Sequence, residues 1–160
     1  MYCFDKIEKL EIPTTKVDQL PIGDLIGKFA KVINTIKPTT VLMPYINDVH
    51  TDHYFVTKAV LSCCKWFRYP SIRNVLYYET ISETDFNINT ADKKINLNVY
   101  VDISKYYDKK IEAIKIYSSE LSDFPFPRSL KSIDALASLR GSQCGAEKAE
   151  AFELLRGVIC

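Results

Sequence analysis

The segment from residue 22 to residue 44 constrains the fold of this chain more than any other. Between Ile22 and Ile36 the apolar side chains recur every three or four residues, which predicts an amphipathic helix with one buried face. Pro38 is expected to end this helix. The apolar run Thr40–Pro44 lacks the alternation of a half-exposed strand, so it predicts a buried strand of a parallel sheet. The apolar positions of the helix are Ile22, Leu25, Ile26, Phe29, Val32, Ile33 and Ile36.

Other segments are rich in β-branched and aromatic residues, which favour strands. These predicted strands are Ile7–Ile12, which Pro13 ends, Ile72–Glu79 and Leu97–Ile103. The segment 146–156 has helical propensity but is also consistent with a terminal strand. Because strands and helices alternate along the chain, we expect an α/β fold, with a Rossmann-like, mostly parallel sheet and flanking helices.

Three further helices are expected. The first runs from about Thr51 to Phe67, and the second follows Ser104, whose hydroxyl is suited to cap it. The third lies near Ser132–Leu139 and is expected to end at the GSQCG sequence that follows. The core-facing side of the second helix is expected to consist of Tyr107, Ile111, Ile114, Tyr117 and Leu121.

The size and charge of the chain exclude several classes of function. Its 160 residues fit one domain, and 21 basic against 20 acidic residues give a net charge of +1. This balance provides no basic surface for a nucleic acid or an anionic membrane. No apolar run approaches the roughly 18 residues of a spanning helix, and the first residues do not have the pattern of a signal peptide. We therefore expect neither nucleic acid nor membrane as a partner.

The cysteines indicate a reducing compartment. There are five of them, no pair has the C-x-x-C spacing, and Cys63 and Cys64 are adjacent, which suits neither a zinc site nor an ordinary disulfide. We therefore expect reduced thiols in a cytoplasmic protein. A hydrolase with a Cys–His pair stays open as an alternative.

The candidate site follows the predicted strand Thr40–Pro44, at the strand end where ligands bind in such sheets. Both histidines of the chain lie there, and His50 and His53 share one face of a helix start. Neutral imidazoles are zinc ligands, and Asp52 could orient one ring or bind metal itself. In the alternative interpretation the loop is only a polar helix cap formed by Asp48 or Thr51. Nothing in the sequence singles out a third ligand, for which Glu79 and Glu83 are the nearest candidates.

A second candidate is the pair Arg140–Gly141, which follows a predicted helix. It is consistent with a C-cap glycine beside a solvated arginine, or with an arginine directed at an oxyanion or a sugar hydroxyl. The motifs G-x-G-x-x-G, P-loop and G-x-S-x-G are absent, so no sequence motif indicates nucleotide binding or serine hydrolysis.

These motifs together resemble a known family. The segment MPYINDVHTDHYFVTKAV is similar to the second signature of the LmbE-like (PIG-L-like) N-deacetylases, in which His-x-Asp-His opens a helix after a strand. The resemblance covers about residues 7 to 156. It implies zinc-dependent removal of N-acetyl groups from N-acetylglucosamine-type amino sugars or their conjugates. Further similar segments follow in order: NVYVDIS, KKIEAIKIYSSEL, FPFPRS, ALASLRGSQCG and AEAFELLR.

The resemblance also implies roles for single residues. His53 would be a zinc ligand, and His50 would stand near the tetrahedral intermediate as an acid or electrostatic stabiliser, oriented by Asp52. Arg140 would bind substrate. Asp48 would not touch the substrate but would support residues that do. In such chemistry zinc polarises the amide carbonyl and lowers the pKa of its bound water, while a carboxylate takes the proton.

One departure from the family pattern limits these implications. The family's first signature, His-Pro-Asp-Asp-Glu, supplies two zinc ligands and the general base, and no such run exists here. We therefore expect residues 1–160 to form a single, N-terminally truncated LmbE-like domain with little or no deacetylase activity alone. Zinc would bind only if the site were completed, by self-association or by a partner that supplies the missing segment. The alternative is a non-catalytic binding or oligomerising subunit.

Overall fold

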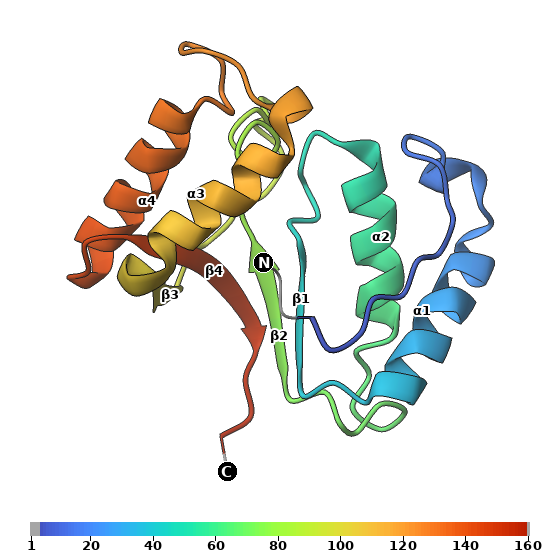
Figure 1. Ribbon diagram of the computed structural model, residues 1–160. Coiled ribbons are helices and arrows are strands. Elements are labelled where there is room, and N and C mark those ends of the chain that lie inside the picture. Colours follow the sequence, from blue (N-terminus) through green and yellow to red (C-terminus); the bar gives the residue numbers. More distant parts are fainter. Residues whose placement is uncertain (1–3, 160) are drawn as a thin grey trace. The chain divides into compact units, whose positions relative to one another are not determined.

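Two helices and two strands alternate within residues 22–78 of the computed structural model, which describes residues 4–159. Strands β1 and β2 are parallel, with Leu42 opposite Leu76. The helix and the strand predicted first are confirmed at both of their bounds, but the strand is not fully buried as predicted, since Leu42 is 53% exposed. The four elements are α1 (Ile22–Ile36), β1 (Thr40–Pro44), α2 (Thr51–Ser62) and β2 (Asn74–Tyr78) (Figure 1).

The chain divides into two compact units. Within the described residues, unit 1 comprises residues 4–7 and 97–151, and unit 2 comprises residues 8–96 and 152–159. The last strand, β4 (Ala149–Arg156), begins in unit 1 and continues into unit 2. Unit 2 also contains the 3-10 helix η1 (Val17–Gln19). The other elements of unit 1 are β3 (Val99–Asp102), η2 (Ser104–Tyr106), α3 (Tyr107–Ile116), η3 (Ser118–Glu120) and α4 (Leu130–Cys144).

The sheet is mixed, so the prediction of a mostly parallel sheet is wrong. Its strand order is β1-β2-β4-β3, and β4 runs antiparallel to β2, with Tyr78 opposite Phe152. The segment whose sequence is consistent with both a helix and a strand forms β4. The buried side chains of Ala149, Ala151 and Phe152 explain why pairing in the sheet overrides the helical propensity of this segment.

Two predictions near the starts of elements are wrong. Residues 7–12 form no strand, because Glu11 has a φ of 52°, outside the extended region. Ser104 does not cap a helix: it opens η2, and α3 begins at Tyr107 without a side-chain cap. The Ser104 hydroxyl instead donates a hydrogen bond of 2.5 Å to Asp102 Oδ1. The expected face of α3 is only half-buried, and Tyr117 is exposed.

Two helix ends also differ from the prediction. Helix α2 ends at Ser62 rather than near Phe67, and Cys63 follows as its C-cap. Helix α4 continues through Gly141 to Cys144 and ends at Gly145, whose φ of 80° is the left-handed conformation that terminates many helices. In the described part of the chain, no helix has the length and apolar character needed to cross a membrane.

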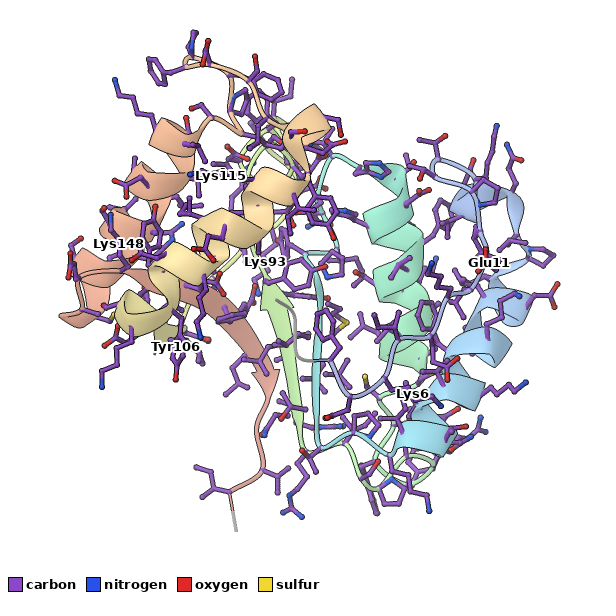
Figure 2. The ribbon with its side chains drawn as sticks, in the orientation of Figure 1. Lys6, Glu11, Lys93, Tyr106, Lys115 and Lys148 are labelled. Carbon is purple, nitrogen blue, oxygen red and sulfur yellow. The ribbon has the colours of Figure 1, made fainter. Side chains whose placement is uncertain are left out.

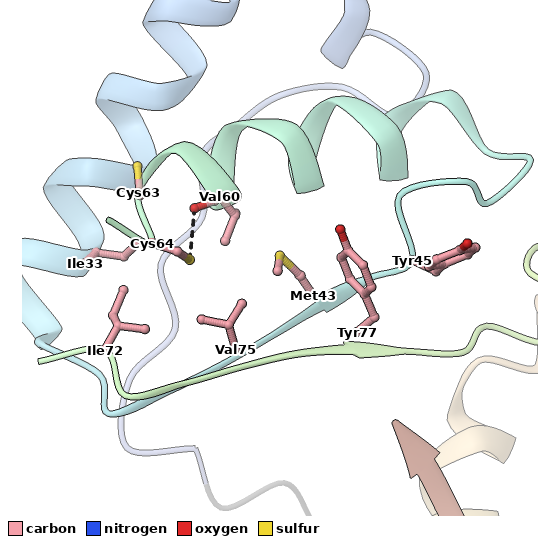
Figure 3. Close-up of a cluster of buried hydrophobic side chains, with 9 residues drawn as sticks. All are labelled: Ile33, Met43, Tyr45, Val60, Cys63, Cys64, Ile72, Val75 and Tyr77. Atoms are coloured by element: carbon pink, nitrogen blue, oxygen red, sulfur yellow. Dashed lines mark hydrogen bonds between the residues drawn. The ribbon is translucent and has the colours of Figure 1, made fainter. Parts of the chain in front are cut away.

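The main core of unit 2 lies between α1, α2 and the strands β1 and β2 (Figure 3). Cys64 Sγ donates a hydrogen bond of 3.3 Å to Val60 O, and burial raises the pKa of both adjacent thiols. Those thiols are therefore protonated packing groups and poor nucleophiles. Cys144 is exposed and free, while Cys3 and Cys160 lie outside the described residues. The buried members of the core are Ile33, Met43, Tyr45, Val60, Cys63, Cys64, Ile72, Val75 and Tyr77.

Candidate functional site

The two histidines open α2 in unit 2, directly after the loop that follows β1. His50 is the N-cap residue, and its Nδ1 accepts a hydrogen bond of 3.2 Å from the backbone N–H of Asp52. The turn before it is closed by the backbone N–H of Asp48, which donates to Tyr45 O at 3.1 Å. The cap is therefore His50 itself, and neither Asp48 nor Thr51 performs this role.

Asp48 links the second histidine to a distant loop. Its side chain has no exposed area, and its Oδ2 accepts a hydrogen bond of 2.7 Å from Nδ1 of His53. Its Oδ1 accepts a hydrogen bond of 2.5 Å from the hydroxyl of Thr84. Since an ionised carboxylate away from water needs partners on its oxygens, these two donors stabilise Asp48 in its buried position.

The two imidazole rings lie against each other. Their centroids are 5.1 Å apart at an interplanar angle of 24°, and 24% of the His53 side chain is exposed. Because Nδ1 is engaged in both rings, Nε2 is the nitrogen of each that a ligand or a proton can reach. A histidine whose Nδ1–H is held by a carboxylate is the usual arrangement of a metal-binding imidazole.

The carboxylate of Asp52 contacts backbone groups of the segment before α1. Its Oδ2 accepts a hydrogen bond of 2.7 Å from the N–H of Thr15, and its Oδ1 accepts one of 3.4 Å from Val17. The contact of Asp52 with His50 comes from its backbone N–H. That the carboxylate itself orients His50 stays a prediction.

A loop between β2 and β3 lies beside the histidine loop within unit 2. The backbone N–H of Val49 donates to Glu83 O at 3.3 Å, and Asn87 Nδ2 donates to Asn47 O at 2.7 Å. The far end of the same loop is held by the buried carboxylate of Glu153, which accepts hydrogen bonds from Lys93 (Figure 2) at 2.7 Å and from Asn96 N at 3.0 Å. Sequence reasoning identified neither Thr84 nor Glu153, because no spacing links them to the loop.

The tyrosines near this loop are protonated at neutral pH. Burial, followed by the negative charge of Glu153, raises the pKa of Tyr77 to about 12. Burial and the charge of Asp48 raise the pKa of Tyr78. Their hydroxyls are therefore neutral groups near the strand ends and do not act as bases.

The described residues do not fit a complete zinc site. Within residues 4–159, no group of three or more His, Cys, Asp or Glu side chains is arranged to hold a metal ion. Neither Glu79 nor Glu83 joins the histidines in such a group, although a catalytic zinc site takes three protein ligands. His53 Nε2 is thus a single candidate ligand. Without further ligands, the site offers only the two imidazoles and the carboxylates of Asp48 and Asp52.

Arg140 lies in unit 1, on α4, and its Nη1 donates a hydrogen bond of 3.0 Å to Gln143 Oε1. The adjacent Gly141 is buried inside the helix, so the interpretation as a C-cap glycine is wrong. A Cβ at this position would lie 2.5 Å from Ala146 O and 2.8 Å from Glu147 O. Gly141 is therefore required by the close approach of the turn that follows the helix. The role of Arg140 in substrate binding stays a prediction.

No family model matches this sequence. The structure is similar to several solved structures at low sequence identity. With the conserved protein TT1542 from Thermus thermophilus the TM-score is 0.63 at 19% identity, over 86% of this chain and 60% of that one. With the N,N'-diacetylchitobiose deacetylase from Pyrococcus horikoshii it is 0.62 at 18% identity, over 87% and 54%.

A third similar structure is the zinc-inhibited form of the teicoplanin deacetylase Orf2. The TM-score is 0.65 at 15% identity, and the match covers 98% of this chain and 60% of that one. This chain therefore spans between 54% and 60% of the length of the three structures. The resemblance noted in the sequence is confirmed at the level of the fold: the chain has the α/β fold of part of an LmbE-like deacetylase, built on a mixed four-stranded sheet.

Proposed function

We propose that this chain carries the histidine loop of a zinc-dependent deacetylase site for N-acetylglucosamine-type amino sugars, and that by itself it is inactive or only weakly active. The observation that carries the proposal is the buried Asp48 carboxylate, which holds His53 by Nδ1 and leaves Nε2 available. The similar fold of two deacetylases supports the class of reaction.

The weak activity follows from what amide hydrolysis requires. A water molecule must lose a proton to a base while an electrophile stabilises the oxyanion. The described residues supply His53 as one ligand and His50 as one hydrogen-bond donor, and no metal-binding group of three. The remaining ligands and the base would have to come from other residues, such as a second copy or a partner chain. Arg140 and Asp52 keep their proposed roles in substrate binding and catalysis.

The proposal is tested on the purified chain with zinc and N,N'-diacetylchitobiose. We expect weak zinc binding by calorimetry, lost in His53→Ala and kept in Cys144→Ser. The second variant removes an exposed thiol, a type of group that can also bind zinc. Acetate release should not exceed that of His53→Ala. Zinc-dependent turnover that His53→Ala abolishes would overturn the expected inactivity, and zinc binding equal in both proteins would overturn the assignment of His53.

A second candidate is a non-catalytic, oligomerising subunit. Strand β1 is at the edge of the sheet, and Leu42 on it is 53% exposed. An edge strand with an exposed apolar side chain is suited to pair with another chain. A stable oligomer that binds neither zinc nor substrate would favour this candidate over the first.

We also propose a cytoplasmic location. Cys63, Cys64 and Cys144 are free thiols, and two of them are buried in a core where reduced cysteine packs as a small apolar residue. A fluorescent fusion expressed in cells measures the location directly, and export of the fusion would contradict the proposal.

A further inference from the structure

We infer that Thr84 is a positioning residue, which acts through Asp48 to fix the tautomer of His53 so that its Nε2 carries the lone pair. Thr84 belongs to the loop after β2, and it is 31 positions from His53 in the sequence. The use of this tautomer in metal binding rests on the proposed function. The existence of this tautomer does not depend on the proposed function, and it can be measured in a protein that has no activity.

Three hydrogen bonds connect Thr80, Thr84, Asp48 and His53 in series, and the first donor determines the direction of the others. The backbone N–H of Thr80 lies 2.8 Å from Thr84 Oγ1 and can only donate. The hydroxyl of Thr84 therefore accepts there, and its single proton is available to Asp48 Oδ1 at 2.5 Å. The backbone around it is constrained as well, because the N–H groups of Glu83 and Thr84 both donate to Thr80 O, at 3.0 and 2.9 Å.

The hydroxyl of Thr84 also determines which carboxylate oxygen His53 can use. The Asp48 side chain is fully buried, so water cannot replace a missing donor. With Oδ1 bonded to Thr84, Oδ2 faces His53 Nδ1 at 2.7 Å. A carboxylate only accepts, so the neutral imidazole carries its proton on Nδ1 and its lone pair on Nε2.

The neighbouring histidine has the opposite arrangement. Nδ1 of His50 accepts from the backbone N–H of Asp52, so the proton of its neutral ring is on Nε2. The two stacked rings therefore present one lone pair and one N–H donor from equivalent nitrogens. A metal ion would bind to His53, while His50 would donate to an oxygen of a substrate.

The experiment compares two threonines of the same turn. Thr84→Val removes the hydroxyl that contacts Asp48 and keeps the β-branched shape. Thr80→Val is the matched control, because Thr80 Oγ1 is buried and has no hydrogen-bond partner among residues 4–159. The readout is the tautomer of each histidine in long-range proton–nitrogen NMR spectra, recorded about two pH units above the ordinary imidazole pKa.

We expect a single His53 tautomer, protonated on Nδ1, in the wild type, in Thr80→Val and in Thr84→Ser, which keeps the hydroxyl. In Thr84→Val the Asp48 carboxylate has no donor on Oδ1 and is free to turn away from His53 Nδ1, so we expect a mixture of both tautomers, with His50 unchanged as the internal reference. A single unchanged tautomer in Thr84→Val would overturn the inference, and so would a wild-type His53 protonated on Nε2, a result that needs no variant to fold. Absent acetate release would bear only on the proposed function.

Discussion

The histidine loop of unit 2 and the end of α4 in unit 1 both carry short sequence patterns that suggested chemistry, but the structure constrains them for different reasons. In the loop, the residues of the pattern contact each other: Asp48 holds His53, and His50 stacks on it. At the end of α4 the constrained residue is Gly141, and the constraint is steric. Arg140 next to it hydrogen-bonds to Gln143 of the same helix.

The two patterns differ in how strongly their residue types determine a contact. Imidazole and carboxylate side chains have few buried partners that satisfy them, so a short spacing of these types predicts a contact between them. A glycine has no side chain to satisfy, and it is selected equally by a left-handed φ, a close approach or a ligand. The Arg140–Gly141 pattern was therefore compatible with several structures, and only the packing of the turn at 146–147 decides between them.

The largest effect should come from Gly141→Ala. The added methyl would meet two backbone oxygens, those of Ala146 and Glu147, and backbone is displaced less easily than the end of a flexible side chain. We expect a loss of about 3 kcal/mol in the free energy of unfolding. Urea denaturation followed by far-UV circular dichroism measures it.

The matched control is Gly145→Ala at the end of the same helix. In the described part of the chain, no atom beyond its two chain neighbours lies within 4 Å of the added methyl there, but the φ of 80° disfavours alanine. This variant should lose only about 1 kcal/mol. A Gly141→Ala variant as stable as Gly145→Ala would contradict the claim that the close approach of residues 146–147 constrains the end of α4.

The hydrogen bonds that hold the histidine loop are tested by Asp48→Asn. The amide keeps one acceptor oxygen and presents an NH₂ group to either the Thr84 hydroxyl or His53 Nδ1, so either Thr84 loses its acceptor or the proton of His53 must move to Nε2. We expect a loss of about 2 kcal/mol in the free energy of unfolding. The same urea titration measures it, which makes the value directly comparable with that of the glycine variants.

Asp52→Asn is the control within the same loop. Its side-chain oxygen can still accept from the N–H of Thr15, and the lost charge at the start of α2 costs about 0.5 kcal/mol. If Asp52→Asn were the more damaging of the two, Asp52 rather than Asp48 would be the acid that holds the loop together.

Much of the fold of unit 2 could be predicted because its signals are local. The apolar spacing of 22–36 and the run at 40–44 each depend on neighbours within one element, and both elements have the predicted bounds. The segment 149–156 could not be assigned this way, because its strand state depends on pairing with β2, more than 70 residues earlier. The mixed sheet follows from that one pairing, which no local pattern indicated.

In the candidate site, too, only the contacts between residues close in sequence could be predicted. The nearness of His50, His53 and Asp48 could be predicted, because the three residues lie within one turn and the start of one helix. The contribution of Thr84 could not, since a threonine in a loop has no distinctive spacing and its contact with Asp48 bridges 36 positions. The buried Glu153 was missed for the same reason, because its partners Lys93 and Asn96 are about 60 positions away.

The smallest effect on stability is expected for Asp134 in unit 1, whose side chain, unlike that of Asp48, is largely exposed. Asp134 on α4 is 52% exposed, and the hydrogen bonds from Lys148 and then from Tyr107 hold its pKa below the ordinary value of 3.8. A lowered pKa means that the folded state favours the charged form, so its contribution is complete above about pH 4 and is lost as the pH falls through the folded-state pKa.

Asp134→Asn should therefore lose less than about 1 kcal/mol in the free energy of unfolding at neutral pH, because water screens an exposed ion pair. Near pH 2 the variant and the wild type should differ less, since a larger fraction of the wild-type acid is protonated there than at neutral pH. Ser138→Ala is the control, because it removes another partner of Lys148, at 2.8 Å, without a titrating group. Its effect should be the same at both pH values. If Asp134→Asn also lost the same amount at both, the half-exposed acid would contribute through shape and neutral hydrogen bonds, and its charge would not distinguish it from the buried Asp48.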